Sequence, residues 1–287
     1  MNHPAELLVY SFLQKAMAGE ATMAEEVAQQ VASDVKSALD KQFNSGPRDE
    51  FRLRMSNIGR PKCQLWFEKN DPEDKTPLPP HFLMNMMLGD IVEAVFKGLL
   101  RAAGAEFKDN DFVTLNLPNG QQIKGEYDME MDGKIDDVKS ASPWSYKNKF
   151  ESFEALQKGD SFGYVAQLVG YAEGAGKEVG GWWVVNKGNG EFKYVPAGDV
   201  DRRAVLEDIQ EVVDYIENDE PFERCFDPVP ETYNRKPSGN LVLSSSCRWC
   251  DFKKKCYPTL QTLPSRVSKA KTLPEVDYVH IGDEQDG

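Results

Sequence analysis

In the stretch KGEYDMEMDGKIDDVKSAS, residues 124–142, the two-residue turn signal Asp132-Gly133 lies between two segments whose side chains alternate in polarity. An Asp-Gly pair between such segments is typical of a β-hairpin. A hairpin closed at this turn sets three opposed pairs: Met131 with Lys134, Met129 with Asp136 and Asp128 with Asp137. Like charges directly opposite each other destabilise a sheet. The stretch therefore predicts a hairpin in which something compensates the repulsion between Asp128 and Asp137.

Alternation gives the second strand two different faces. Asp137 and Lys139 point to one face. The other, apolar face combines three side chains: Tyr127, Met129 and Val138. A divalent cation between Asp128 and Asp137 would relieve the repulsion, and Lys139 is placed to hold an attacking water or to stabilise developing phosphate charge. The alternative is a solvated acidic face that Lys139 screens.

Composition places the chain among ordinary globular proteins. Its 287 residues are 40% hydrophobic and 28% charged, enough for one large core or two modest ones. The sequence contains no basic segment followed by an apolar run at its start and no run of about 18 apolar residues, so we expect neither export nor a membrane span. A net charge of -13 argues against a general polyanion-binding surface. We expect a cytoplasmic protein.

Hydrophobic periodicity predicts alternating strands and helices, which indicates an α/β fold. The predicted helices cover 4–45, 83–100, 148–157, 164–176 and 204–218, and the predicted strands cover 112–117, 121–140 and 180–187. We divide the chain into an N-terminal helical region (1–54), a core (55–260) with cysteines at both ends, and a polar, flexible tail (261–287).

The hairpin residues resemble a known arrangement. Asp128 together with Asp137-Val138-Lys139 resembles the catalytic core of the PD-(D/E)xK nucleases. Gln167 and Tyr171 lie four residues apart and share one face of a predicted helix. They resemble the Gln-x-x-x-Tyr signature of the RecB-like branch, although alone they would be a surface glutamine and a half-buried tyrosine. The resemblance implies a phage or prokaryotic member of this branch.

An upstream helix in this family supplies a further metal ligand, usually a histidine four residues after a glycine. Glu93 stands four residues after Gly89 in this chain. A carboxylate ligates hard cations well, so the departure shifts the expected metal preference toward Mg²⁺ without abolishing the site. The alternative is a glutamate that only makes its helix more soluble.

The resemblance implies a restriction-endonuclease-like fold: a central mixed β-sheet flanked by helices, with an N-terminal helical cap and a C-terminal cysteine-cluster region. It also implies a metal-dependent DNA exonuclease that hydrolyses phosphodiester bonds in DNA processing, recombination or replication. The implied ligands of Mg²⁺ or Mn²⁺ are Glu93, Asp128, Asp137 and the Val138 carbonyl oxygen. Lys139 would position and help deprotonate the water, and Gln167 and Tyr171 would orient DNA or a metal-bound phosphate.

Five cysteines, three of them clustered, do not fit a secreted disulfide framework, so we expect metal ligation in a reducing compartment. Cys247-x2-Cys250-x5-Cys256 resembles the C-terminal triplet of RecB-like nucleases that hold an iron–sulfur cluster. Cys63 stands where those proteins carry a distant fourth ligand, which leaves Cys225 as the spare. Four thiolates suit a 4Fe-4S cluster or tetrahedral zinc, and spacing alone does not separate the two. The expected role of the centre is structural.

Contacts with DNA are expected beside the hairpin and in the cysteine motif. The candidates are Ser140, Trp144, Lys147, Lys149, Arg248, Lys253 and Lys254. A rival function is a catalytically silent, cluster-bearing module of the same fold that binds DNA or serves assembly, against which the presence of Asp128, Asp137 and Lys139 argues. A replication or recombination protein is a candidate partner. The sequence leaves the oligomeric state and the cleavage polarity open.

Overall fold

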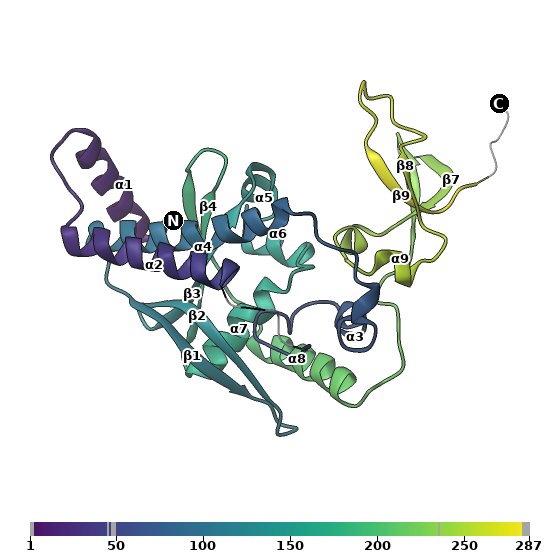
Figure 1. The fold of residues 1–287 in the computed structure, drawn as a ribbon, viewed down its shortest axis with the longest axis horizontal. Coiled ribbons are helices and arrows are strands. Elements are labelled where there is room, and N and C mark those ends of the chain that lie inside the picture. Colours follow the sequence, from purple (N-terminus) through teal and green to yellow (C-terminus); the bar gives the residue numbers. More distant parts are fainter. Residues whose placement is uncertain (1–2, 45, 47–49, 235, 283–287) are drawn as a thin grey trace. The chain divides into compact units, whose positions relative to one another are not determined.

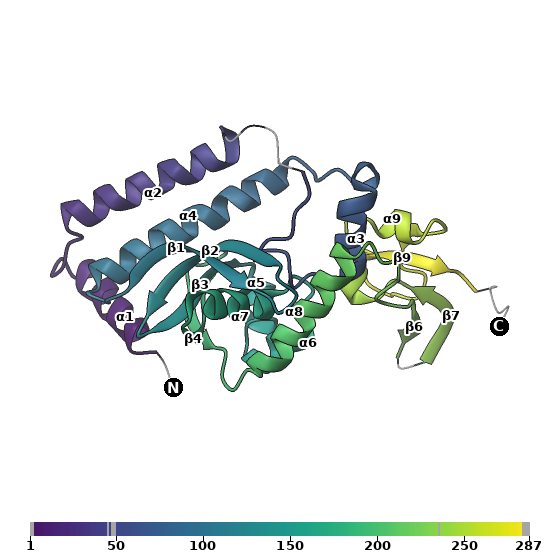
Figure 2. The same cartoon turned by 90° about the horizontal axis from the view of Figure 1, so that it is seen from below.

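The computed structural model describes residues 3–44, 46, 50–234 and 236–282. The chain forms two compact units, whose elements are drawn in Figures 1 and 2. Unit 1 contains Met1–Gly59 and Pro79–Asp214, and unit 2 contains Arg60–Leu78 and Tyr215–Gly287. This division differs from the expected core over 55–260. Its physical reason is that residues 60–78 and 215–260 form a compact body with the C-terminal segment.

Unit 1 is built on a mixed five-stranded sheet with the order β1-β2-β3-β4-β5. Its strands are β1 (Lys108–Asn116), β2 (Gln122–Met131), β3 (Lys134–Ala141), β4 (Glu178–Asn186) and β5 (Phe192–Pro196). β3 and β4 are parallel, and the other neighbours are antiparallel. A parallel pair needs a crossover connection. The crossover consists of α5 (Pro143–Asn148), α6 (Phe153–Lys158) and α7 (Tyr164–Ala175). The predicted α/β class is confirmed.

Helices cover both faces of this sheet. Figure 2 shows α4 (His81–Ala102) on one side and α7 on the other. Both α1 (Pro4–Met17) and α2 (Glu25–Phe43) contact α4, and α8 (Arg202–Glu217) follows the last strand of the sheet. Within the described residues, every helix is too short or too polar to cross a membrane.

The single helix expected over 148–157 is wrong, because α5 ends at Asn148 and α6 begins only at Phe153. Ser152 starts α6 by accepting a hydrogen bond from the Ala155 N–H on its side chain. A serine in this position satisfies a backbone donor that the helix itself leaves without a partner. The cap therefore fixes a break between the two short helices at 149–152.

The predicted hairpin turn forms. Asp132 and Gly133 have φ angles of 53° and 75°, the positive values that a type I′ turn requires. The ladder between β2 and β3 contains three pairs: Met129–Asp136, Glu130–Ile135 and Met131–Lys134. Two of the three expected pairs are thereby confirmed. The expected Asp128–Asp137 pair lies outside this ladder, because the Val138 N–H donates a hydrogen bond to the Asp128 carboxylate at 2.7 Å instead.

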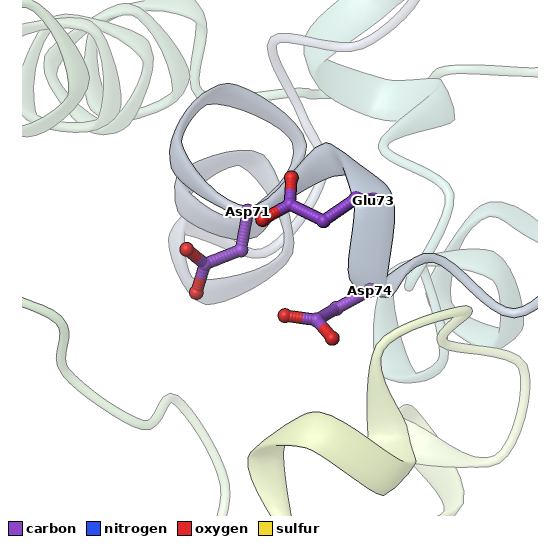
Figure 3. A group of neighbouring side chains, drawn as sticks. All are labelled: Asp71, Glu73 and Asp74. Atoms are coloured by element: carbon purple, nitrogen blue, oxygen red, sulfur yellow. The ribbon is translucent and has the colours of Figure 1, made fainter.

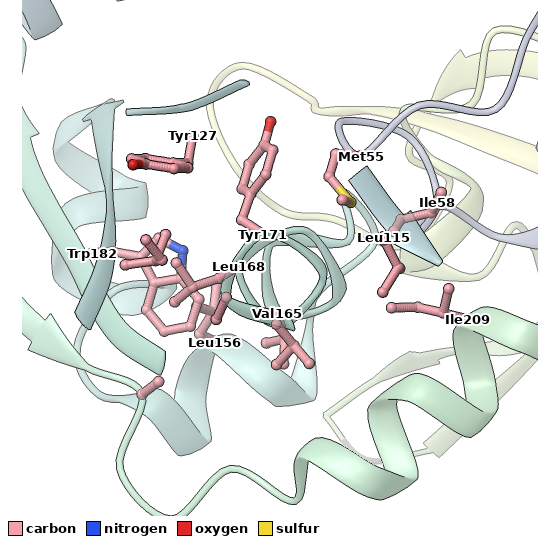
Figure 4. Close-up of a cluster of buried hydrophobic side chains, with 14 of the residues drawn as sticks. Met55, Ile58, Leu115, Tyr127, Leu156, Val165, Leu168, Tyr171, Trp182 and Ile209 are labelled. Carbon is pink, nitrogen blue, oxygen red and sulfur yellow. The ribbon is translucent and has the colours of Figure 1, made fainter. Parts of the chain in front are cut away.

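Two apolar clusters lie on the two faces of the sheet. The larger one includes residues of α7, and Figure 4 shows Tyr127 and Tyr171 among its members. The second contains Met129 and Val138 with residues of α1 and α4. The expectation that Tyr127 shares an apolar face with Met129 and Val138 is therefore wrong. Tyr127 and Met129 are two residues apart on β2 but belong to different clusters, so the alternation expected along this strand does not hold between them.

Unit 2 contains an antiparallel four-stranded sheet with the order β6-β7-β9-β8. Its strands are β6 (Val229–Tyr233), β7 (Lys236–Val242), β8 (Gln261–Pro264) and β9 (Glu275–His280). Its helical segments are α3 (Lys62–Asn70), η1 (Pro72–Asp74), η2 (Ser245–Cys247) and α9 (Lys253–Cys256).

The flexible tail expected over 261–287 is wrong where β8 and β9 form. Tyr278 of β9 is 1% exposed, and its hydroxyl donates to the Glu231 carboxylate at 3.0 Å. A buried tyrosine with a satisfied hydroxyl contributes a large apolar surface. This burial outweighs the polar composition that suggested a tail. The part of the predicted tail at 283–287 lies outside the described residues.

Candidate active site and cysteine centre

Three acidic side chains from separate elements of unit 1 interact electrostatically: Glu93 of α4, Asp128 of β2 and Asp137 of β3. Asp137 is 2% exposed. Burial raises the pKa of the Asp137 carboxyl to about 8, and the charges of Asp128 and Glu93 act in the same direction. Burial also raises the pKa of Glu93, and the charge of Asp128 adds to this effect. The fold thus places the three predicted carboxylates where their charges repel one another, although their ligand atoms do not all lie within 4.8 Å of one another.

Lys139 neutralises part of this negative charge. Its Nζ lies 2.6 Å from the Asp137 carboxylate, to which it donates a hydrogen bond. Lys139 Nζ lies 2.6 Å from both oxygens of this carboxylate, from Oδ1 in a hydrogen bond and from Oδ2 in an ion pair. Burial acts to lower the pKa of Lys139, but the charges of Asp137 and Asp128 outweigh it and raise that pKa above its ordinary value. The side chain therefore stays protonated at neutral pH, which suits an electrostatic role better than that of a base.

Glu93 has a cation beside it that sequence reasoning missed. Lys97 follows Glu93 by one helical turn in α4 and donates a hydrogen bond to its carboxylate at 2.8 Å. Lys97 is 4% exposed, whereas the Glu93 side chain remains 30% exposed. The i, i+4 spacing of the pair is the signal that would have revealed it. Glu93 and Asp128 both line a pocket that residues of α2 also border.

The predicted Gln167 and Tyr171 pair lies on α7. Gln167 Nε2 donates to the Tyr171 hydroxyl at 3.3 Å. Burial raises the pKa of Tyr171 to about 12, and the charge of Asp137 also acts to raise it. Figure 4 shows the Tyr171 ring leaving α7 toward β2, where a Cβ on Gly125 would come within 2.7 Å of its Cε1. A glycine at this point of β2 is what leaves room for the ring.

The expected metal ligand Val138 has a defined backbone environment. Its N–H donates to Asp128, and it lies opposite Trp183 in the parallel β3–β4 pair. Its side chain is buried in the cluster on the α4 face. Asp128 is thus tied to the strand that carries both Asp137 and Lys139.

The expected DNA contacts divide into two groups. Trp144, Lys147, Arg248 and Lys254 are exposed, whereas Ser140, Lys149 and Lys253 are half-buried. Ser140 Oγ would lie 3.6 Å from a Cβ on Gly89. Lys253 pairs with Asp277 at 2.6 Å, and Lys149 lies 3.9 Å from Asp160. Carboxylates of the chain therefore already compensate the charges of these two lysines, and their contact with DNA stays a prediction.

The cysteines meet within unit 2. Four of them, Cys63, Cys247, Cys250 and Cys256, line one pocket together with aromatic side chains. These are the four that the sequence assigned to a metal centre. Burial raises the pKa of Cys247 to about 12 and that of Cys250 to about 11, so the thiols have low acidity in a site without a metal ion. A metal would have to displace these protons on binding.

Cys225, expected to be the spare, lies against Cys63. The Cys63 N–H donates to Cys225 Sγ at 3.1 Å. A side-chain hydrogen bond from Cys63 lowers the pKa of Cys225 to about 7, and the same side-chain bond raises the pKa of Cys63. The fifth cysteine is therefore an immediate neighbour of the centre, a proximity that its position in the sequence did not indicate.

A second acidic group lies in unit 2 at the end of α3. Figure 3 shows the carboxylates of Asp71, Glu73 and Asp74, whose ligand atoms lie within 4.8 Å of one another. Among the described residues, this is the one trio of Asp, Glu, His or Cys side chains that meets this spacing. Lys255 pairs with Asp74 at 2.5 Å and with Asp71 at 3.5 Å,. The lysine already compensates much of this charge.

The chain was compared with known proteins. No family model matches it, and no curated protein matches it either. A solved structure described as the crystal structure of SSO0001 is 14% identical, with a TM-score of 0.41 over 80% of this chain and 96% of that one. A likeness at this level identifies no family for the chain.

Proposed function

We propose that this chain is a metal-dependent DNA nuclease of the PD-(D/E)xK superfamily, with a restriction-endonuclease-like core of the RecB-like branch. It acts as an exonuclease in the cytoplasm during DNA processing, recombination or replication. One observation carries the proposal. Glu93, Asp128 and Asp137 come from three elements and interact with one another and with Lys139.

The chemistry of these donors fits a hard divalent cation. Mg²⁺ and Mn²⁺ prefer oxygen ligands, and three carboxylates supply them. The buried Asp137 carboxylate pairs with Lys139, and the charges of Asp128 and Glu93 oppose its ionisation, which a bound cation would offset. Glu93, Asp128, Asp137 and the Val138 carbonyl would hold the cation. When bound, it would supply Lewis acidity and a water of lowered pKa.

The other side chains have separate roles. Lys139 remains protonated and would hold the attacking water in place and stabilise charge that develops on the phosphate. Gln167 and Tyr171, already joined by a hydrogen bond, would orient the DNA phosphate. The Val138 N–H fixes the Asp128 carboxylate, so this ligand needs little reorganisation when the substrate binds.

We propose that Cys63, Cys247, Cys250 and Cys256 hold a 4Fe-4S cluster with a structural role. Tetrahedral zinc, with Zn–S bonds of about 2.3 Å, keeps its sulfurs within about 4 Å of one another. Within the described ranges, no three cysteine sulfurs all lie within 4.8 Å of one another. Four thiolates suit a four-iron cluster, and tetrahedral zinc on the same sulfurs is the alternative. The ligands come from both segments of unit 2 and would hold them together.

The first experiment uses end-labelled linear DNA and covalently closed DNA with Mg²⁺, Mn²⁺ or EDTA. The wild-type protein should degrade the linear DNA alone and only with metal, and the order of label release gives the polarity. Lys139→Ala and Asp137→Ala should be inactive while remaining folded. If the cluster-loaded wild type binds DNA but cleaves none, and neither substitution changes that affinity, the chain is instead a binding or assembly module.

A further inference from the structure

A stack of cations and aromatic rings connects the candidate catalytic lysine with the protein surface. Lys139 Nζ lies 5.3 Å from the centre of the Tyr164 ring. Lys149 Nζ lies 4.4 Å from the Tyr164 ring and 4.7 Å from the Phe162 ring. The two rings are stacked, with centres 5.7 Å apart and planes 13° from parallel. Phe162, at the outer end, is 45% exposed.

The segment that carries Phe162 is held in place from both sides. The Asp160 carboxylate accepts hydrogen bonds from the N–H groups of Tyr164 at 3.0 Å and Val165 at 2.8 Å, which caps the start of α7. Gly163 has a φ angle of 74°, and a Cβ there would lie 2.3 Å from the Gly59 carbonyl carbon. Asp160 before Phe162 is therefore tied to the start of α7, and Gly163 after it packs closely against the Gly59 backbone.

Lys149 strengthens this arrangement from within. Its side chain is 12% exposed and lies 3.9 Å from Asp160, so it does not extend into solvent to meet a phosphate. Its position over both rings is a cation–π arrangement, which favours ring orientation in a partly desolvated site. The exposed Phe162 ring is thus presented in a fixed orientation at the end of a short path from Lys139.

We propose that Phe162 is a stacking platform that receives an unpaired base of the DNA substrate next to the active site. Aromatic rings stack on any base, because every base has a π-face. In a duplex these faces are already stacked on their neighbours, so a single-stranded end offers its bases at lower cost. The platform would therefore favour DNA with a single-stranded end. This inference rests on the proposed nuclease function.

The test measures base stacking on the full-length, cluster-loaded protein without Mg²⁺ or Mn²⁺, so that no cleavage occurs. A single-stranded oligonucleotide carries 2-aminopurine, whose fluorescence falls on stacking, near its end. Phe162→Ala should weaken binding about tenfold, within the range found for one base–aromatic contact, and should abolish the fluorescence change. Phe162→Trp should restore both. The matched control is Phe112→Ala, which removes a phenylalanine that is 77% exposed on β1, and it should bind as the wild type does.

Two results would overturn the inference: equal binding by Phe162→Ala and the wild type, or an equal loss of binding in Phe112→Ala.

Cleavage assays on overhanging and blunt duplexes separate this inference from the proposed function. Phe162→Ala should lose its preference for the overhang while still cleaving blunt DNA. A wild type that binds and stacks the base but cleaves nothing would refute the nuclease proposal and leave the platform standing. A wild type that cleaves, with binding and preference unchanged in Phe162→Ala, would refute the platform alone.

Discussion

The Asp128 carboxylate accepts a hydrogen bond of 2.7 Å from the backbone N–H of Val138 on the neighbouring strand. A direct pairing of Asp128 with Asp137 would have set two carboxylates face to face. The observed bond gives Asp128 a donor of its own, whereas Asp137 pairs with Lys139. Asp128 and Asp137 thus each have a protein partner of their own, a backbone N–H for Asp128 and the Lys139 ammonium for Asp137.

This bond predicts different behaviour for two substitutions of Asp128. Asp128→Asn keeps an oxygen that accepts from Val138, whereas Asp128→Ala leaves that N–H without a partner. We expect both variants to lose nuclease activity by about 100-fold or more, since each loses a metal ligand. Urea unfolding should show that only Asp128→Ala loses stability, by about 1–2 kcal/mol. Equal destabilisation of both variants would mean that the bond to Val138 does not hold the hairpin.

Asp137→Asn should stabilise the metal-free protein, because it removes one of three carboxylates that repel one another. In EDTA, its Tm should exceed that of the wild type. Added Mg²⁺ should raise the Tm of the wild type, since a ligand that binds the folded state stabilises it, and should leave the variant nearly unchanged. Thermal scans with a Mg²⁺ titration check both points. An unchanged Mg²⁺ response in the variant would exclude Asp137 as a ligand.

The stability difference between Asp137→Asn and the wild type should depend on pH. Burial raises the pKa of Asp137 from its ordinary 3.8 to about 8 in the folded chain. A carboxyl with a raised pKa contributes stability below its ordinary pKa and loses it as the pH rises through the folded value. In EDTA, the Tm advantage of Asp137→Asn should therefore widen from pH 4 to about pH 8 and then level off. An advantage that narrows over this range would contradict the assignment.

Local signals in the sequence predicted the hairpin turn, the residue pairs next to it and the Gln167–Tyr171 pair. Asp132-Gly133 specifies its turn through backbone conformation alone, so the pairs next to it followed. The i, i+4 spacing of Gln167 and Tyr171 likewise placed both side chains together on α7. These features depend on a few adjacent residues, and a single sequence contains the information for them.

Features that depend on distant contacts were not predictable in this way. The sheet of unit 2 joins β6 and β7 to β8 and β9, and the polar composition of the last segment gave no sign of it. The ion pair of Lys253 with Asp277 depends on the same sheet. Tyr127 packs with residues of α7 in one cluster, whereas Met129 and Val138 pack in the other, which the alternation of the strand did not predict. In each case tertiary packing, rather than local pattern, decides the result.

Gly125 should be sensitive to the smallest substitution. A Cβ at this position would lie 2.4 Å from Met55 Cβ and 2.7 Å from Tyr171 Cε1. Because both neighbours would have to move to make room for the methyl group, we expect Gly125→Ala to cost about 1–3 kcal/mol of stability. The substitution should also lower activity, because it displaces Tyr171. Urea unfolding and the cleavage assay measure the two effects.

The matched control is Gly89→Ala in α4, where a Cβ would lie 3.6 Å from Ser140 Oγ, an ordinary contact. Alanine is favoured over glycine in a helix by about 1 kcal/mol, so this variant should be as stable as the wild type or more so. Equal losses in the two variants would show that the space around Gly125 is not the cause.

The cysteine centre provides the last prediction, which concerns Cys63 and Cys225. The two residues are in contact, but Cys63 lines the pocket with the C-terminal triplet. We therefore expect anaerobically purified Cys63→Ala to lose most of its iron and its visible absorption. Cys225→Ala should keep both, because it removes a neighbour of the centre and not a ligand. Iron and zinc analysis of each variant makes the comparison.

The outcome also separates the two kinds of metal centre. Iron retained in Cys63→Ala and lost in Cys225→Ala would make Cys225 the fourth ligand, and their contact explains how one sulfur would take the place of the other. Zinc near one ion per chain, with no iron in the wild type, would refute the iron–sulfur cluster. In that case the sulfurs must approach within about 4 Å of one another on binding.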